Sequence, residues 1–486
     1  MRHALAAVTA AIFLSGCVAG PDYGGPPSMA AAAAFARASN EAATRDPPVD
    51  TWWSLLGDPV LDQLEAQALE GNLGVEAARA RIAQARASVR QQQANRLPTI
   101  AGQATAVQAN VPGLGLGSGS PSTGPTQGQD DHLSIYNLGL NANWELEFAG
   151  GQSRRVQLAK AQVGAALASV DDAKVQLTAE VARAYVSLRE AQQRLLLAHE
   201  ERDLQQQTLA LTYQRYTAGV LPLFPVGAAN ADLERLKSKI AEAGADIAIF
   251  KDALSVLTGA APGRLDGLLS TMASVPLPPA NVPIGDPAAL IARRPDIRAD
   301  ERRLAASTSR VGVVEAARFP RLSFMGIMGV GGTGPQDVLD LGNVSAIALP
   351  RLQWSLLDFG RNGAAVDEAE GALSEADARY RETVLKALQD AEQALARFGQ
   401  QRVNVAALSQ IYRQAETAAE LSRQRFDAGA IGLSDLNQAL RQRAEARANL
   451  NRAIAAMTIS WVAIQKSLGL GWRSDAAAPN EGRRFE

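Results

Sequence analysis

The amino-acid sequence repeats itself once, and this repeat limits the possible folds more than any other feature. Near residues 96–98, Arg-Leu-Pro matches Arg-Phe-Pro at 318–320, and the spacing is 222. Farther along, five pairs of identical residues are spaced by 210: Trp144/Trp354, Gly150/Gly360, Arg215/Arg425, Gly219/Gly429 and Gly259/Gly469. The change in spacing places a length difference between the prolines and the tryptophans. We therefore expect two structural repeats, over residues 58–285 and 286–469.

Each half predicts the same order of elements. A helix that ends at a proline comes first, because proline cannot continue a helix. Two strands follow, then a very long proline-free helix, a glycine turn and a shorter helix. A helix of that length spans on the order of 100 Å, which is more than a globular domain needs. The expected helices are 58–96, 152–218 and 228–258, then 286–318, 361–428 and 434–468; the expected strands are 99–109, 133–147, 321–331 and 343–355.

The first long helix carries an apolar stripe with alternating steps of three and four residues, interrupted once by Lys174. This period predicts coiled-coil packing, although an ordinary helical bundle is an alternative. The stripe consists of Val163, Leu167, Val170, Leu177, Val181, Ala184, Leu188, Ala191, Leu195 and Ala198.

The expected strands have the length and alternation of transmembrane β-strands. Within 133–147, apolar residues from Tyr136 to Leu146 alternate with asparagines and Glu145. Four strands cannot close a barrel, and open sheet edges are not tolerated in hydrocarbon. If the strands lie in a membrane, several chains must share one barrel, and three chains would supply twelve strands. A soluble sheet of two hairpins is the alternative.

The N-terminus resembles a bacterial lipoprotein signal. A short positive start precedes an apolar run, which ends in Leu-Ser-Gly before Cys17, the only cysteine. We expect a signal peptide over 1–16, lipid attachment at Cys17 and an extended segment over 17–57. Val18 follows the cysteine rather than aspartate, which for such lipoproteins indicates the outer membrane. Residues 470–486 are expected to form a tail.

Composition gives no sign of an enzyme or of a nucleic-acid-binding protein. The formal net charge is −2, and the chain has three histidines and one cysteine. A basic surface for nucleic acid is therefore not indicated. We predict no catalytic residues, no metal site and no cofactor, because no cluster of suitable side chains is visible.

Two segments carry a family resemblance. Trp52-Trp53, followed by Leu-Leu-Gly-Asp-Pro, resembles the entry segment of NodT-type lipoproteins of the TolC-like outer-membrane factor family. The run Arg-Arg-Pro-Asp-Ile at 293–297 resembles the start of their second half. The resemblance implies a mainly α fold with a membrane β-barrel. It also implies a homotrimer with a twelve-stranded barrel and a periplasmic helical tunnel, a periplasmic adaptor (membrane fusion) protein, and an inner-membrane pump of the RND, MFS or ABC type.

The resemblance further implies that the two helix-to-helix turns contact the adaptor and that the helix after the second turn lines the periplasmic aperture. The residues concerned at the turns are Tyr216, Gly219, Val220, Leu221, Phe426, Gly429 and Ala430. At the aperture they are Ser434, Asp435, Gln438 and Arg441. We expect Asp435 to line the constriction and to pair with Arg441, or else to cap the helix that starts near Ser434.

The predicted function is a passive outer-membrane conduit for small molecules in a tripartite efflux system. A channel for protein secretion of type I has the same fold and is one alternative. A structural lipoprotein without a pore, which anchors the envelope, is the other.

Overall fold

The computed structural model describes residues 18–29, 32–38, 43–44, 46–110 and 132–472. Cys17 and residues 111–131, which connect the first two expected strands, lie outside this part. The chain forms two compact units. The first comprises residues 1–26, 83–163 and 302–377, and the second comprises 27–82, 164–301 and 378–486. Each unit takes in pieces of both halves of the chain, so neither sequence repeat is a compact unit.

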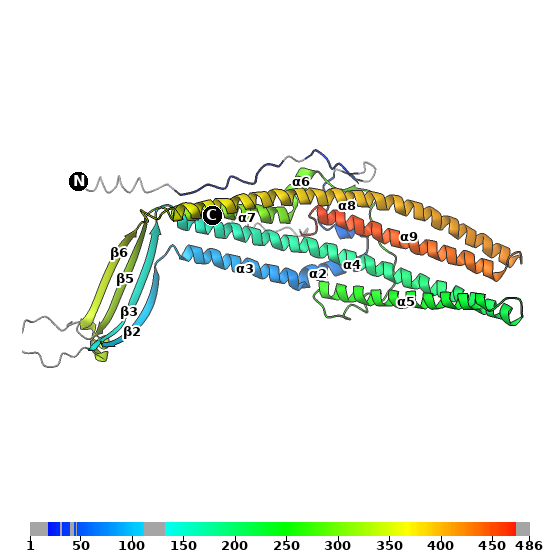
Figure 1. Cartoon of the computed structure of the whole chain (residues 1–486), viewed down its shortest axis with the longest axis horizontal. Coiled ribbons are helices and arrows are strands. Elements are labelled where there is room, and N and C mark those ends of the chain that lie inside the picture. Colours follow the sequence, from blue (N-terminus) through cyan, green and yellow to red (C-terminus); the bar gives the residue numbers. More distant parts are fainter. Residues whose placement is uncertain (1–17, 30–31, 39–42, 45, 111–131, 473–486) are drawn as a thin grey trace, which may run out of the picture. The chain divides into compact units, whose positions relative to one another are not determined.

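The first unit contains a four-stranded antiparallel sheet (Figure 1). The strand order is β2-β3-β5-β6, and each strand agrees with its expected bounds to within two residues. Among the described residues β2 pairs only with β3, and β6 only with β5, so the sheet has two open edges. The strands are β2 (Thr99–Asn110), β3 (His132–Glu147), β5 (Arg321–Gly332) and β6 (Val344–Gln353).

The helices confirm the internal repeat. α4 (Gly151–Thr217) and α8 (Arg361–Asp427) have 67 residues each. α5 (Phe224–Leu257) and α9 (Leu433–Ser467) run back along them, and Figure 1 shows both turns at the same end. The remaining helices are α2 (Pro59–Gly71), α3 (Leu73–Ala94), α6 (Pro287–Arg293) and α7 (Pro295–Ala316). The short strands β1 (Ala43–Thr44) and β4 (Val282–Pro283) pair in parallel.

The repeat extends to individual side-chain contacts. The indole Nε1 of Trp144 donates to the carbonyl of Arg96 at 2.9 Å, and the indole Nε1 of Trp354 donates to the carbonyl of Arg318 at 3.0 Å. In both halves the indole thus ties the end of the second strand to the turn that precedes the first strand. This common contact explains why the two tryptophans recur at equivalent positions.

The prediction of single helices over 58–96 and 286–318 is wrong, because each of these segments is two helices. The first breaks at Asn72 (ψ 121°) and the second at Arg294 (ψ 123°), which are equivalent positions. Asn72 caps α3 by accepting from the backbone N–H of Gly74 and Val75. Arg294 precedes a proline, which disfavours the helical conformation of the residue before it.

The core of the second unit includes much of the predicted stripe of α4. From Val170 onward most stripe residues are buried, whereas Leu167 is 41% exposed. The fully buried Trp52 packs edge-on against Trp461 of α9, with ring centroids 5.5 Å apart. The Trp-Trp segment of the family resemblance is therefore a core anchor for the chain before α2.

The segment between α5 and α6 is held against α4 by side-chain amides and a guanidinium. These groups donate to backbone carbonyls, which would otherwise lack partners in a segment without regular structure. The pairs are Arg189 to Thr271 at 2.6 Å, Gln192 to Leu269 at 2.9 Å and Gln193 to Ala273 at 3.0 Å.

Glu65 in α2 predicts a pH-dependent stability. Its side chain is fully buried, and neither carboxylate oxygen has a hydrogen-bond partner. Burial, and secondly the charge of Asp62, raise the pKa of Glu65 well above its ordinary value. Below the ordinary pKa the carboxyl is protonated in both states. Above it the unfolded chain ionises while the folded chain does not, so the free energy of unfolding falls with rising pH.

Glu65→Gln should therefore be more stable than the natural chain at neutral pH and about equally stable near pH 4. The difference should grow by at most about 1.4 kcal/mol per pH unit. Thermal melts of the purified proteins between pH 4 and 8 measure it. Glu70→Gln, at an exposed position of the same helix, is the control. A constant difference between Glu65→Gln and the natural chain at every pH would contradict the assignment.

Candidate channel surfaces at the sheet and the helix turns

The sheet has one wholly apolar face. Directly paired residues of neighbouring strands point to the same side, and the pairing aligns the apolar residues of all four strands. From the level of Tyr136 to that of Leu146, this face has no charged or amide side chain. It includes Ile100, Ala104, Leu138, Leu140, Ala142, Trp144, Leu322, Phe324, Met328, Val330, Ala346 and Leu352.

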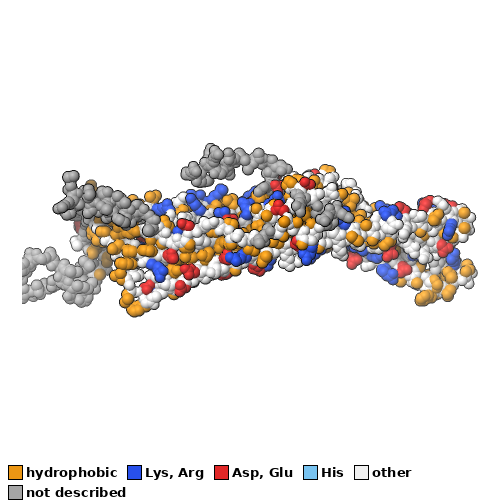
Figure 2. Space-filling model, turned by 90° about the horizontal axis from the view of Figure 1, so that it is seen from above, with side chains coloured by type: hydrophobic (Ala, Val, Ile, Leu, Met, Phe, Trp, Pro, Cys, Tyr) orange, Lys and Arg blue, Asp and Glu red, His pale blue; other side chains and the backbone are white. Residues whose placement is uncertain are grey.

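The apolar side chains of the sheet are exposed in the single chain. Leu138 is 52% exposed, Met328 is 52% exposed and Leu352 is 65% exposed. Figure 2 shows hydrophobic side chains gathered over the strands on the face in view, whereas charged side chains are spread over the helices. The opposite face carries Asn137, Asn141, Asn143, Glu145 and Arg351 among smaller and apolar residues. The sheet therefore has one side suited to hydrocarbon and another that tolerates water.

The two helix-to-helix turns close in the same way. Gly219 has φ 74° and Gly429 has φ 72°, a conformation that favours glycine. The N–H of Gly219 donates to the carbonyl of Tyr216, and that of Val220 donates to the carbonyl of Arg215, both at 2.9 Å. Gly429 and Ala430 repeat these bonds in the second turn. These are the bonds of the Schellman motif, which ends a helix and reverses the chain.

The two turns differ in surface chemistry although their backbones match. After the first turn, Val220 is 69%, Leu223 60% and Phe224 82% exposed. Beside them, α4 and α5 enclose a hollow of about 400 Å³, lined by Gln206, Leu209, Ala210, Tyr213, Val226 and Asn230. In the second turn Phe426 is half-buried and Gly429 and Ala430 are exposed. The first turn is thus apolar, while the second presents small residues with Asp427.

Leu223 and Phe224 were not among the sequence-predicted turn residues, because α5 was expected to begin at residue 228 and begins at Phe224. A signal for them exists in the sequence. No charged residue occurs between Arg215 and Asp232. Such an uncharged run at an exposed helix turn is unusual for a surface in water.

Ser434, Asp435, Gln438 and Arg441 all lie in the first turns of α9, and the structure does not pair Asp435 with Arg441. Asp435 instead accepts from the N–H of Gly432 at 3.3 Å and caps its own helix. Arg441 donates to the side-chain carbonyl of Gln205 in α4. The expected ion pair is therefore not the contact that this structure shows, and the capping alternative describes Asp435.

Gln205 and Asn437 are two buried polar residues at contacts between helices that sequence reasoning missed. Gln205 is 1% exposed and donates to the carbonyl of Ala229 in α5 at 2.8 Å. Asn437 of α9 is 1% exposed and donates to the hydroxyl of Thr208 in α4 at 3.2 Å. Through Arg441 and Asn437, α9 is fastened to α4. Isolated polar residues on long helices gave no signal of this pairing.

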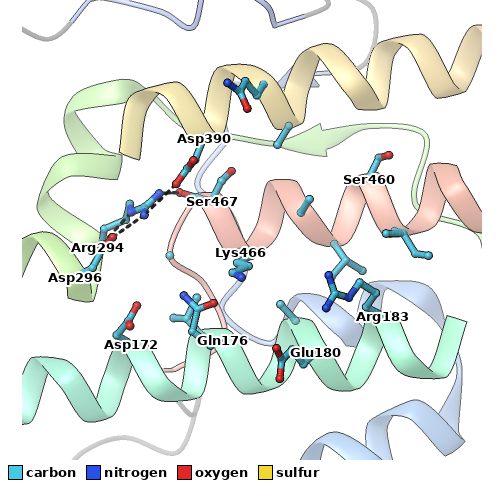
Figure 3. A pocket seen from close by; sticks show the side chains of 18 of the residues that line it. Asp172, Gln176, Glu180, Arg183, Arg294, Asp296, Asp390, Ser460, Lys466 and Ser467 are labelled. Carbon is cyan, nitrogen blue, oxygen red and sulfur yellow. Dashed lines mark hydrogen bonds and ion pairs between the residues drawn. The ribbon is translucent and has the colours of Figure 1, made fainter. Parts of the chain in front are cut away.

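The Arg-Arg-Pro-Asp-Ile segment fastens the start of α7 to α8 and α9 (Figure 3). Arg294 donates to Asp296 at 2.6 Å and to the carbonyl of Ser467 at 2.9 Å, and its guanidinium lies 3.6 Å from Asp390. These residues border a cavity of about 600 Å³. Burial, and secondly Asp296, raise the pKa of Asp172 across the cavity. The guanidinium of Arg294 thus holds together the start of α7, α8 and the end of α9 at a helix junction.

Two further properties concern metals and membrane helices. Among the described residues, no group of three or more His, Cys, Asp or Glu side chains is placed to hold a metal ion. In the same part of the chain, no helix is both long enough and apolar enough to cross a membrane.

The chain contains two tandem sets of the same elements: a broken helix, a pair of strands, a 67-residue helix and an antiparallel return helix. This arrangement defines the TolC-like class of fold. The outer membrane efflux protein family matches residues 64–260 and 287–470. Nodulation protein T of Rhizobium leguminosarum bv. trifolii is 31% identical over 96% of this chain and 97% of its own length. Outer membrane protein OprJ of Pseudomonas aeruginosa is 30% identical over 87% of each chain.

Among solved structures, the outer-membrane channel OprN is similar with a TM-score of 0.80 and 30% identity, over 94% of this chain and all of the other. The chain belongs to the outer membrane efflux protein family, and its role is that of an outer-membrane efflux channel. The predicted resemblance and fold class are confirmed. Its relatives are channel proteins, which supports at family level the prediction that the chain is not an enzyme.

Proposed function

We propose that three copies of this chain form the outer-membrane channel of a tripartite efflux system. The observation that carries the proposal is the sheet with one wholly apolar face and two open edges. In hydrocarbon an unpaired backbone group costs several kcal/mol, so both edges need partners. Further copies of the same chain supply matching edges, and three copies give the twelve strands that the family resemblance implies.

The membrane anchor proposed for the mature chain is lipid on Cys17. The sequence around it supports this modification, since cleavage before the cysteine would leave it at the N-terminus. Several acyl chains, each methylene contributing about 0.8 kcal/mol, make a stable anchor. Loss of radiolabelled palmitate from a Cys17→Ser variant would test it.

The proposed partners are a periplasmic adaptor at the two helix turns and an inner-membrane pump that supplies the energy. The exposed apolar side chains of the first turn and the hollow beside it support docking of another helix there. Relatives named for cation efflux and for pyoverdine export support small solutes as the cargo. The proposed pump is of the RND, MFS or ABC type.

Conductance in planar bilayers and heat-modifiable trimer bands test the channel itself. A purified trimer that conducts ions supports the proposal, and a monomer without conductance supports the structural lipoprotein instead. Drug susceptibility of a deletion strain distinguishes export of small molecules from export of a protein. Hypersensitivity to small toxic compounds supports efflux, whereas loss of a secreted protein alone supports type I secretion.

Arg441→Ala should raise the single-channel conductance. We propose that Ser434, Asp435, Gln438 and Arg441 lie at the periplasmic aperture, and Arg441 is the member that ties α9 to α4 through Gln205. Without that contact the second helix pair can move outward more easily. Asp435→Ala should have a smaller effect, since Asp435 caps its own helix. Unchanged conductance in both variants would remove these residues from the gate.

A further inference from the structure

The residues that follow Cys17 are fastened to the first unit. The N–H of Ala19 donates to the carbonyl of Ala149 at 2.9 Å, at the junction between β3 and α4. Arg154, in the first turn of α4, makes three further contacts with this segment. Its Nε donates to the carbonyl of Ala19 at 3.0 Å, and its Nη2 donates to that of Gly20 at 2.8 Å. Its Nη1 pairs with Asp22 at 2.8 Å.

Arg154 is almost completely enclosed by these contacts. Its side chain is 3% exposed, and its one further described partner is Gln157 of the same helix. A buried guanidinium is costly unless its donors are satisfied. The N-terminal segment supplies acceptors to all three nitrogens, so arginine and segment satisfy each other's polar groups.

Two glycines allow the segment to approach α7 closely. A Cβ on Gly20 would lie 2.3 Å from the Cα of Gly312, which is far inside the contact distance. A Cβ on Gly312 would lie 2.9 Å from the carbonyl oxygen of Ala19 and 2.8 Å from Nε of Arg154. Backbone therefore packs directly on backbone, and a larger side chain at either glycine would push the segment away from Arg154.

The second repeat shows that the fold does not need this arrangement. It also enters its long helix through a glycine of positive φ, Gly360 at 88°, as Gly150 does at 72°. The residue of the second repeat equivalent to Arg154 is Ala364. The residue of the first repeat equivalent to Gly312 is Arg90. The arginine and the glycine occur together only at the junction where the N-terminal segment lies.

We infer that Arg154 is a positioning residue that seats residues 18–22 at the junction of β3 and α4. This inference rests on the proposed lipid anchor at Cys17. Cleavage before Cys17 would place the acylated residue directly before the seated segment. The acyl chains then emerge at the base of the strands, where the apolar sheet face ends. The anchor is thereby oriented on the channel and is not merely a flexible tether.

Hydrogen exchange on the purified full-length protein tests whether residues 18–22 are held at the junction of β3 and α4. The amide of Ala19 is protected by its bond to Ala149, so this amide should exchange slowly in the natural chain. Arg154→Ala and Gly312→Ala should each make this exchange about tenfold faster or more. Arg155→Ala is the matched control, because Arg155 is the next residue and pairs with Glu147 instead. It should leave the exchange unchanged.

Palmitate labelling of the same preparations distinguishes the placement of residues 18–22 from lipid attachment at Cys17. Equal labelling of the natural chain and all three variants, with faster exchange only in Arg154→Ala and Gly312→Ala, supports the inference. Unlabelled natural protein overturns the proposed anchor, and with it the orienting role, even if the exchange data stand. Unchanged exchange in Gly312→Ala overturns the seat. This holds even if Arg154→Ala fails to fold, because Gly312→Ala removes no polar group.

Discussion

Leu140→Arg is expected to prevent accumulation of the channel in the outer membrane. Leu140 lies near the middle of β3 on the wholly apolar face, opposite Met328 of β5 and Gly102 of β2. An arginine at the midplane of a membrane barrel costs about 2–4 kcal/mol, and a trimer carries it three times. The heat-modifiable trimer should therefore disappear from outer-membrane fractions, as measured by immunoblotting.

Asn141→Arg is the control for this substitution. Asn141 is the next residue of the same strand and points to the opposite face, together with Asn137 and Asn143. The same charge at that position should leave the amount of trimer close to that of the natural chain. Equal loss in both variants would show that β3 does not separate a hydrocarbon side from a water side, and the proposed barrel would have to be abandoned.

Phe224→Asp is expected to abolish export while leaving the pore intact. Phe224 is 82% exposed at the start of α5, the helix whose Val226 lines the hollow between α4 and α5. A buried aromatic anchor at an interface typically contributes at least about 2 kcal/mol, and a charge in its place adds a desolvation cost. A deletion strain complemented with Phe224→Asp should therefore remain as drug-sensitive as the deletion strain.

Two measurements distinguish a docking defect from a damaged channel. Single-channel conductance of Phe224→Asp in planar bilayers should equal that of the natural chain. Leu339→Asp is the matched substitution, because Leu339 is 84% exposed but lies in the connection between β5 and β6. It should complement fully. Full complementation by Phe224→Asp would exclude the first turn as an essential contact for the adaptor.

The differences between the sequence prediction and the structure have identifiable causes. The helix breaks at Asn72 and Arg294 were missed because each interrupts a pattern otherwise typical of one helix. At Asn72 the interruption is a single capping side chain. At Arg294 it is the following proline, a residue that is also tolerated in the first turn of a helix. The start of α5 was placed four residues late, although Pro225 lies within its first turn. Proline is compatible with the first turn, where its missing N–H would have had no partner anyway.

The contacts of α9 could not have been predicted. Asp435 and Arg441 lie in the same helix, but Arg441 contacts Gln205, more than 200 residues away. A long side chain can have more than one possible partner. The partner that it contacts depends on the rotation of neighbouring helices, and the local spacing of residues does not encode that rotation. For the same reason, the position of Arg154 on a long helix does not predict its contact with the N-terminal segment.

The sequence by itself determined the repeat, the order of the elements, the alternation of the strands and the glycine turns. All of these are local or periodic properties, set by backbone sterics and by the spacing of apolar residues along one segment. Only the tertiary structure decided how the apolar faces of the four strands align. It also decided that Arg154 holds the N-terminal segment. These features depend on register and close approach between segments far apart in the chain, where distances of a few ångströms select the partner.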